Sequence, residues 1–150
     1  MASAFDVARY IIKSLPTDNL KLQKLLYYCQ AVHLVLYDKN PLFHEEIEAW
    51  DYGPVVPAVY KEYRNHGFET IPSPDKPLDE SSGLDMNKIR VIDMTMACFG
   101  GMSGTELINQ THSETPWKEA YRLGKPSKVI TLDAIYTFFK DTLSFSDDEL

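Results

Sequence analysis

The sequence predicts a mainly α protein of the α+β class: a compact helical domain around a central buried helix, with one small β-sheet or hairpin. Apolar residues recur at helical spacing through most of the chain, and a short aromatic alternation ahead of a Gly-Pro pair indicates a strand. The length of 150 residues suits a single domain over 1–150. We expect its core over 5–143 and an acidic tail over 144–150.

The first part of the chain is expected to form two helices. Ser3 is suited to cap a helix over residues 4–15, because its hydroxyl can accept a backbone N–H of the first turn, and Pro16 ends that helix. Residues 19–37 form the longer helix. Since apolar residues cover nearly all of its faces, this helix is expected to be the hub of the fold. A turn over 38–41 closes it.

The middle of the chain is expected to hold the β-structure. Residues 42–52 are the best candidate for a strand, and Gly53-Pro54 is expected to stop it. A helix over 55–66 follows. Pro57 fits only in the first turn of that helix, because its ring would break an interior turn.

A loop rich in proline, serine and aspartate, residues 71–84, leads to the C-terminal helices. Its length is unusual for a compact domain and indicates a mobile or functional loop. Beyond it, helical spacing and caps predict residues 86–99 as a helix, 103–111 as a short helix, a helix capped by Thr115, a strand within 125–130, and a last helix capped by Thr131.

Charge and composition narrow the function classes. Acidic residues outnumber basic ones, 22 to 15, which gives a net charge of −7. This charge disfavours a nucleic-acid partner and favours a basic protein partner. No apolar run is long enough to span a bilayer, and the N-terminus lacks the features of a signal peptide, so a cytoplasmic location is expected. Cys29 and Cys98 are expected to be reduced, buried thiols.

The segment over residues 48–60 is the most informative motif. Trp50 and Tyr52 flank an aspartate and precede Gly53-Pro54, which indicates aromatic residues held at a rigid corner. From the residues alone, a structural role is favoured, since aromatic side chains dominate core burial. A recognition surface is the alternative. The segment carries no nucleophile, metal-ligand set or phosphate-binding glycine run, so no catalytic residue, metal site or cofactor is expected.

The second motif covers residues 112–117. A helix–helix corner is favoured here, with His112 near the end of one helix and Trp117 packed below the start of the next. Two alternatives stay open. The paired short helices could be a helix-turn-helix with Trp117 on the recognition helix, although its charges are mixed. His112 with a carboxylate such as Glu114 could serve a small hydrolase or nuclease.

A run of the predicted central helix resembles a known family. Residues 21–34 read K-L-Q-K-L-L-Y-Y-C-Q-A-V-H-L, and this run is similar to that of the Panacea domain, the SocA-like antitoxin family that includes phage-associated GepA proteins. Two later blocks also match, one over residues 41–60 and one containing His112 and Pro116-Trp117. The family often has tryptophan where this chain has Val32. The resemblance covers residues 5–140.

The resemblance implies an antitoxin that neutralises a cognate toxin, encoded by an adjacent gene, through direct protein contact and without an enzymatic activity. It names neither the toxin nor the oligomeric state. We expect the two motifs to lie near each other and to form the partner-binding surface. The candidate residues are Trp50, Tyr52, Gly53, Pro54, Val55, Val56, Tyr60, His112 and Trp117.

Overall fold

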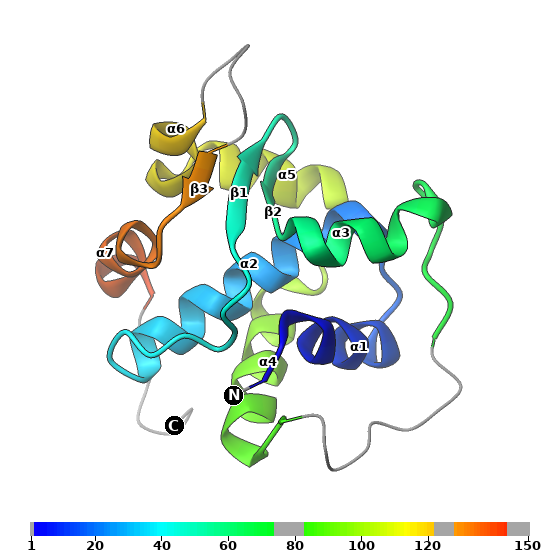
Figure 1. Ribbon diagram of the computed structural model, residues 1–150, viewed down its shortest axis with the longest axis horizontal. Helices are drawn as coiled ribbons and strands as arrows, with labels where there is room; N and C mark the ends of the chain where they lie inside the picture. Colours follow the sequence, from blue (N-terminus) through cyan, green and yellow to red (C-terminus); the bar gives the residue numbers. More distant parts are fainter. Residues whose placement is uncertain (1, 74–82, 122–127, 144–150) are drawn as a thin grey trace.

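The computed structural model describes residues 2–73, 83–121 and 128–143. Those residues form seven α-helices, one 3-10 helix and a small three-stranded antiparallel sheet, which confirms the predicted fold class (Figure 1). The elements are α1 (Ala4–Ser14), α2 (Asn19–Leu36), β1 (Ile47–Trp50), β2 (Gly53–Val55), α3 (Pro57–Tyr63), η1 (Arg64–His66), α4 (Met86–Phe99), α5 (Gly104–His112), α6 (Thr115–Ala120), β3 (Lys128–Ile130) and α7 (Leu132–Thr142).

Helix α2 is the hub of the fold, as predicted. Every residue from Leu22 to Leu34 is buried, and α2 contacts α1, α3, α4, α5, α7 and β2 (Figure 1). The Tyr28 ring stacks on Phe99 of α4 at a centroid distance of 4.0 Å, and Phe139 of α7 packs edge-on against it at 6.0 Å. Since a helix that is apolar on all faces must be covered on all faces, the other elements wrap around it.

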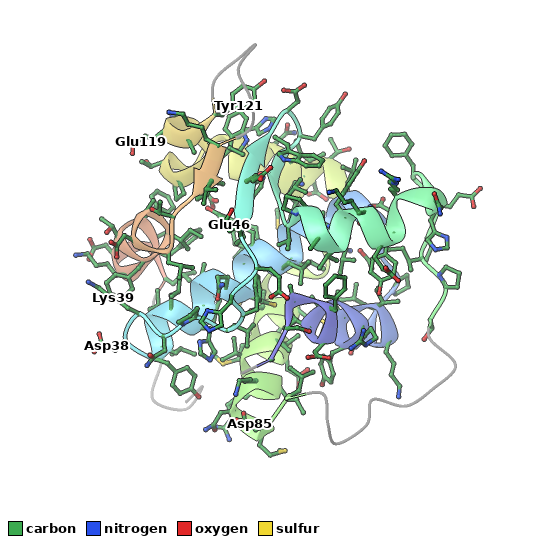
Figure 2. All side chains as sticks on the ribbon, in the orientation of Figure 1. Asp38, Lys39, Glu46, Asp85, Glu119 and Tyr121 are labelled. Atoms are coloured by element: carbon green, nitrogen blue, oxygen red, sulfur yellow. The ribbon has the colours of Figure 1, made fainter. Side chains whose placement is uncertain are left out.

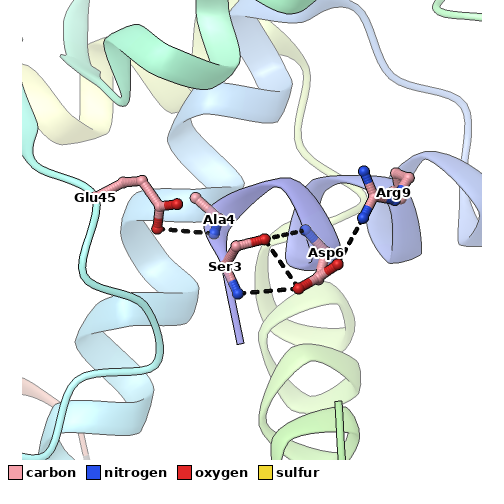
Figure 3. Close-up of polar contacts among 5 residues, drawn as sticks. All are labelled: Ser3, Ala4, Asp6, Arg9 and Glu45. Atoms are coloured by element: carbon pink, nitrogen blue, oxygen red, sulfur yellow. Dashed lines mark hydrogen bonds and ion pairs between the residues drawn. The ribbon is translucent and has the colours of Figure 1, made fainter. Parts of the chain in front are cut away.

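Helix α1 begins with a complete capping box (Figure 3). Ser3 Oγ accepts the Asp6 backbone N–H at 3.2 Å, and the Asp6 carboxylate accepts the Ser3 backbone N–H at 3.0 Å. Arg9 pairs with the same carboxylate. The free N–H of Ala4 donates to Glu45 Oε1 at 3.0 Å, which ties the start of α1 to the segment ahead of the sheet.

The sheet has the order β2-β1-β3 and is antiparallel throughout. It corrects the predicted strand over 42–52, which is limited to Ile47–Trp50. It also corrects the role of Gly53-Pro54. This pair does not stop the β-structure but begins β2, with Pro54 opposite Ala49. An edge strand tolerates proline, and the positive φ of Gly53, 106°, suits the end of a tight turn.

Two helix predictions need adjustment. The predicted helix over 55–66 begins at Pro57, because Val55 pairs with β1, and its last residues form the 3-10 helix η1. Thr115 does not cap α6: the N-cap is Glu114, whose backbone is extended and whose side chain forms no cap hydrogen bond. The predicted helix over 86–99 is confirmed, with Asp85 as its cap.

Cys29 is buried as predicted, whereas Cys98 is exposed on α4, and both are free thiols. The prediction for Cys98 was wrong because its position on the helix faces away from α2. Most of the predicted loop over 71–84 and the whole predicted tail over 144–150 lie outside the described residues, as does the first part of the predicted 125–130 strand.

Candidate functional site

The two sequence motifs lie side by side, as predicted. The indole N–H of Trp117 on α6 donates to the Trp50 carbonyl at the end of β1, with Nε1 2.8 Å from the oxygen. The Tyr121 hydroxyl donates to the Asp51 carboxylate in the hairpin turn. Figure 2 shows Tyr121 beside the tip of that hairpin. Helix α6 and its C-cap residue Tyr121 are therefore fastened to the β1 side of the hairpin turn.

Stacked rings stiffen this junction. The His112 ring stacks on Trp117 at 4.0 Å between centroids, and Trp117 stacks on Tyr121 at 4.5 Å. On the other side of β1, Trp50 meets Tyr60 of α3 edge-on at 5.0 Å. We call these five residues the aromatic corner. Aromatic pairs in such geometries stabilise beyond their buried area, so the corner is a rigid support for the hairpin.

His112 is held as a neutral ring inside the corner. It forms a hydrogen bond with the Asp51 backbone, while its Nε2 atom is buried and has no hydrogen-bond partner among the described residues. Burial lowers the pKa of His112 below its ordinary value, and the nearby charge of Lys24 lowers it further. An uncharged imidazole therefore suits this position at neutral pH.

Glu114, the carboxylate considered for a catalytic pair with His112, is engaged elsewhere. Its two oxygens accept hydrogen bonds from the hydroxyls of Tyr28, at 3.0 Å, and Tyr27, at 3.4 Å, both on α2. Burial raises the pKa of Glu114 to about 7, and the two tyrosine hydroxyls oppose that rise. The carboxylate thus fastens the start of α6 to the central helix.

Lys24 on α2 is a member of the site that sequence reasoning missed. Its side chain is fully buried, and its ammonium donates to the Pro54 carbonyl of β2 at 3.1 Å. A Cβ atom on Gly53 would lie 2.7 Å from Lys24 Cε and 2.9 Å from Thr111 Oγ1. The close approach of the hairpin to α2 and α5 therefore requires glycine here. Burial lowers the pKa of Lys24 to about 7.

Two further polar side chains of α2 hold the segment that follows the hairpin. Gln23 Oε1 accepts the backbone N–H of Val56 at 2.9 Å. The Asn19 amide donates to the Tyr60 carbonyl at 3.1 Å. Buried backbone groups without such partners would be costly, so these side chains fix the path of the chain from β2 into α3.

The nine candidate partner-binding residues differ sharply in exposure. Gly53, Pro54, Val55 and Val56 are buried, and Trp50, Tyr60, His112 and Trp117 are half-buried within the corner. Only Tyr52, at the tip of the hairpin, is largely exposed, at 62%. The structure therefore gathers eight of the nine residues into a scaffold and presents the ninth to solvent.

Residues 2–73, 83–121 and 128–143 lack two kinds of feature. No three histidine, cysteine, aspartate or glutamate side chains in this part of the chain form a group that could hold a metal ion. Each helix there is too short or too polar to cross a membrane.

The fold and the corner define a small, mainly helical domain in which an antiparallel hairpin is fastened across a central helix. Residues 22–118 match the model of the family described as "Antitoxin SocA-like, Panacea domain". The chain therefore belongs to this family, and the match spans both sequence motifs.

A curated relative agrees with this assignment. The chain is 35% identical over 113 residues to "Antitoxin SocA" of Caulobacter vibrioides (strain NA1000 / CB15N). The match covers 69% of this chain and 59% of the relative, so the chain spans about three-fifths of that protein's length. No solved structure matches the chain significantly.

Proposed function

We propose that this protein is an antitoxin that neutralises a cognate toxin protein by binding it directly. The observation that carries the proposal is the family match over residues 22–118, which includes the hairpin and the aromatic corner except Tyr121. The rigid corner supports it further, because a preorganised surface binds with little loss of conformational entropy. The toxin is the product of an adjacent gene, and the pair acts in the cytoplasm.

The net charge of this chain favours a positively charged partner. The net charge of −7 attracts a basic protein and raises the rate of encounter with it. If the toxin is basic, the association rate falls as the salt concentration rises, since exposed charges are screened beyond about 10 Å at 0.1 M salt.

The two other readings of the sequence have less support. A recognition helix at Trp117 would be only 6 residues long, and its Trp117 side chain is occupied by the Trp50 carbonyl. A hydrolase based on His112 and Glu114 lacks the expected pairing, because the Glu114 carboxylate binds the Tyr27 and Tyr28 hydroxyls.

Co-expression tests the proposed function. Each neighbouring reading frame is expressed alone and then together with this chain, and growth is recorded. We expect one neighbour to arrest growth alone and to become harmless with this chain. A His112→Ala variant that melts like the parent is expected to rescue growth as the parent does. If every neighbouring gene product is harmless when expressed alone, there is no toxin for this chain to neutralise, and the antitoxin proposal is contradicted.

A further inference from the structure

A pocket of about 490 Å³ lies beside the tip of the hairpin. Its wall comes from four segments that are distant in sequence: the start of α2 with Leu20, the hairpin turn with Tyr52, the residue Phe68 after η1, and α5 with Ser103 and Ile108. Figure 1 shows the hairpin, α3 with η1, and α5 on one side of the molecule. We call this the Tyr52–Phe68 pocket.

Two aromatic side chains stand exposed at this pocket. Phe68 is 82% exposed and Tyr52 62%, and no hydrogen bond or ring contact with the described residues holds either one. Leu20 and Ile108, both half-buried, add apolar surface between them. A folded chain normally buries aromatic side chains of this size, so an exposed pair around one pocket is typical of a surface that a partner covers.

The helix ends at the pocket already carry negative charge. Asp18 caps α2 by accepting the Lys21 N–H at 2.8 Å, and its carboxylate also lies 3.8 Å from where a Cβ on Gly104, the first residue of α5, would sit. Glu106 accepts the Ser103 N–H at 2.9 Å at the start of α5. The N-termini of α2 and α5 carry partial positive charge, and carboxylates of this chain already occupy both. The pocket therefore does not favour an anionic ligand.

Further acidic residues adjoin the aromatic pair. Asp51 precedes Tyr52 and Glu69 follows Phe68, and both are exposed. Lys21, beside Gly104 of the pocket wall, carries the opposite charge, and its ammonium is held by the Gly100 carbonyl at 2.7 Å. With the net charge of −7, the surroundings favour a partner segment that carries lysine or arginine.

We infer that the Tyr52–Phe68 pocket is the toxin-docking site, and that it receives an apolar anchor side chain from a basic segment of the toxin. This inference rests on the proposed antitoxin function. Binding energy in protein interfaces concentrates in a few anchors set in apolar pockets and surrounded by residues that exclude water. Tyr52 and Phe68 line the pocket and are both largely exposed, which suits a protein surface more than an enclosed small molecule.

The aromatic corner then has a defined part in docking. Tyr52 lies between Asp51, which is bound by Tyr121, and Gly53, which packs on Lys24. The turn is thus fixed on both sides of Tyr52. The buried candidate residues position this side chain, and the toxin contacts Tyr52 itself.

Three variants test the docking site: Tyr52→Ala, Phe68→Ala and the double variant. Met86→Ala is the matched control, since Met86 is 74% exposed at the start of α4 and does not line the pocket. The probe is the purified product of the adjacent gene that arrests growth, and its Kd is measured by calorimetry beside the melting temperature of each variant. We expect each single change to raise Kd about tenfold or more and the control to leave it within about twofold.

Phe68→Ala protects the test against a folding artefact, because an 82% exposed side chain contributes little to stability. A double variant that melts like the parent and binds with the parent's Kd overturns the docking site and leaves the antitoxin function standing. A parent chain that does not bind the growth-arresting protein overturns both. If only the pocket variants bind weakly, while the parent and Met86→Ala bind tightly, both the docking site and the antitoxin function are supported.

Discussion

Lys24→Met is expected to raise the free energy of unfolding by about 1–3 kcal/mol near pH 6, because it removes a buried ammonium whose only hydrogen bond to the protein among the described residues is the Pro54 carbonyl. Methionine has nearly the same length and leaves no large cavity. The lost hydrogen bond offsets part of the gain, at about 1 kcal/mol.

The lowered pKa of Lys24 also predicts how the free energy of unfolding changes with pH. Burial lowers the pKa of Lys24 from 10.5 to about 7 in the folded chain. Between these two values the unfolded chain binds a proton that the folded chain does not, so the free energy of unfolding rises with pH. Each unit of pKa difference corresponds to about 1.4 kcal/mol. Lys24→Met should abolish this rise on the alkaline side.

Glu114 contributes the opposite slope on the acidic side. Burial raises its pKa from 4.5 to about 7 in the folded chain. Between these values the folded chain holds a proton that the unfolded chain has lost, so the free energy of unfolding falls as pH rises. The two groups together predict a minimum in their contribution to stability near neutral pH.

Denaturant unfolding at about pH 5, 7 and 9 measures these slopes. Glu114→Gln is the matched variant, and it should flatten the acidic side while leaving the alkaline rise intact. Parallel profiles for the parent and Lys24→Met would mean that Lys24 titrates in the folded chain as it does in water, and the buried environment described for it would be wrong.

Leu26→Ala is expected to lower the free energy of unfolding by about 3–5 kcal/mol, since truncation of a fully buried leucine removes apolar contacts and leaves a cavity. Leu26 lies on α2, which contacts five other α-helices and strand β2. Leu132→Ala on α7, where leucine is 39% exposed, is the control and should cost less than about 1 kcal/mol. A Leu26→Ala variant that melts with the parent contradicts the central position of α2.

The central helix was predictable from sequence because an all-round apolar pattern has one stable placement, at the centre of a helical fold. The hairpin was only partly predictable. Gly53-Pro54 has the composition of a strand terminator, and its place in an edge strand depends on pairing with Ala49 and on contact with Lys24. The contact with Lys24 joins distant segments, so local sequence does not encode it.

Some residues of the candidate site could be predicted from the sequence, and others could not. The proximity of the hairpin and the His112 motif could be predicted, since both are distinctive corners of one small domain. Lys24 was missed, although a lysine within a helix that is apolar on all faces is a visible signal of a buried charge. Phe68 was missed for a deeper reason: nothing in its local sequence distinguishes an exposed phenylalanine from a buried one.

Buried Lys24 fixes the hairpin at a cost in stability. Its ammonium holds the β2 edge against α2 through the Pro54 carbonyl, and Gly53 permits the close approach. An apolar residue would make a more stable core, yet it could not bind that carbonyl. The polar link therefore fixes the hairpin that carries Tyr52, at a cost in stability.

Neutralisation of the toxin by complex formation, as proposed above, can be measured by titration. Increasing amounts of this protein are added to a fixed amount of the growth-arresting neighbour, and residual toxin activity is measured after several incubation times. We expect toxin activity to fall linearly to zero at a fixed whole-number ratio of the two proteins. Longer incubation should not change this ratio, and both proteins should be recovered intact in one complex. Loss of all toxin activity at a trace amount of this protein, growing with time, would contradict it and indicate an enzyme.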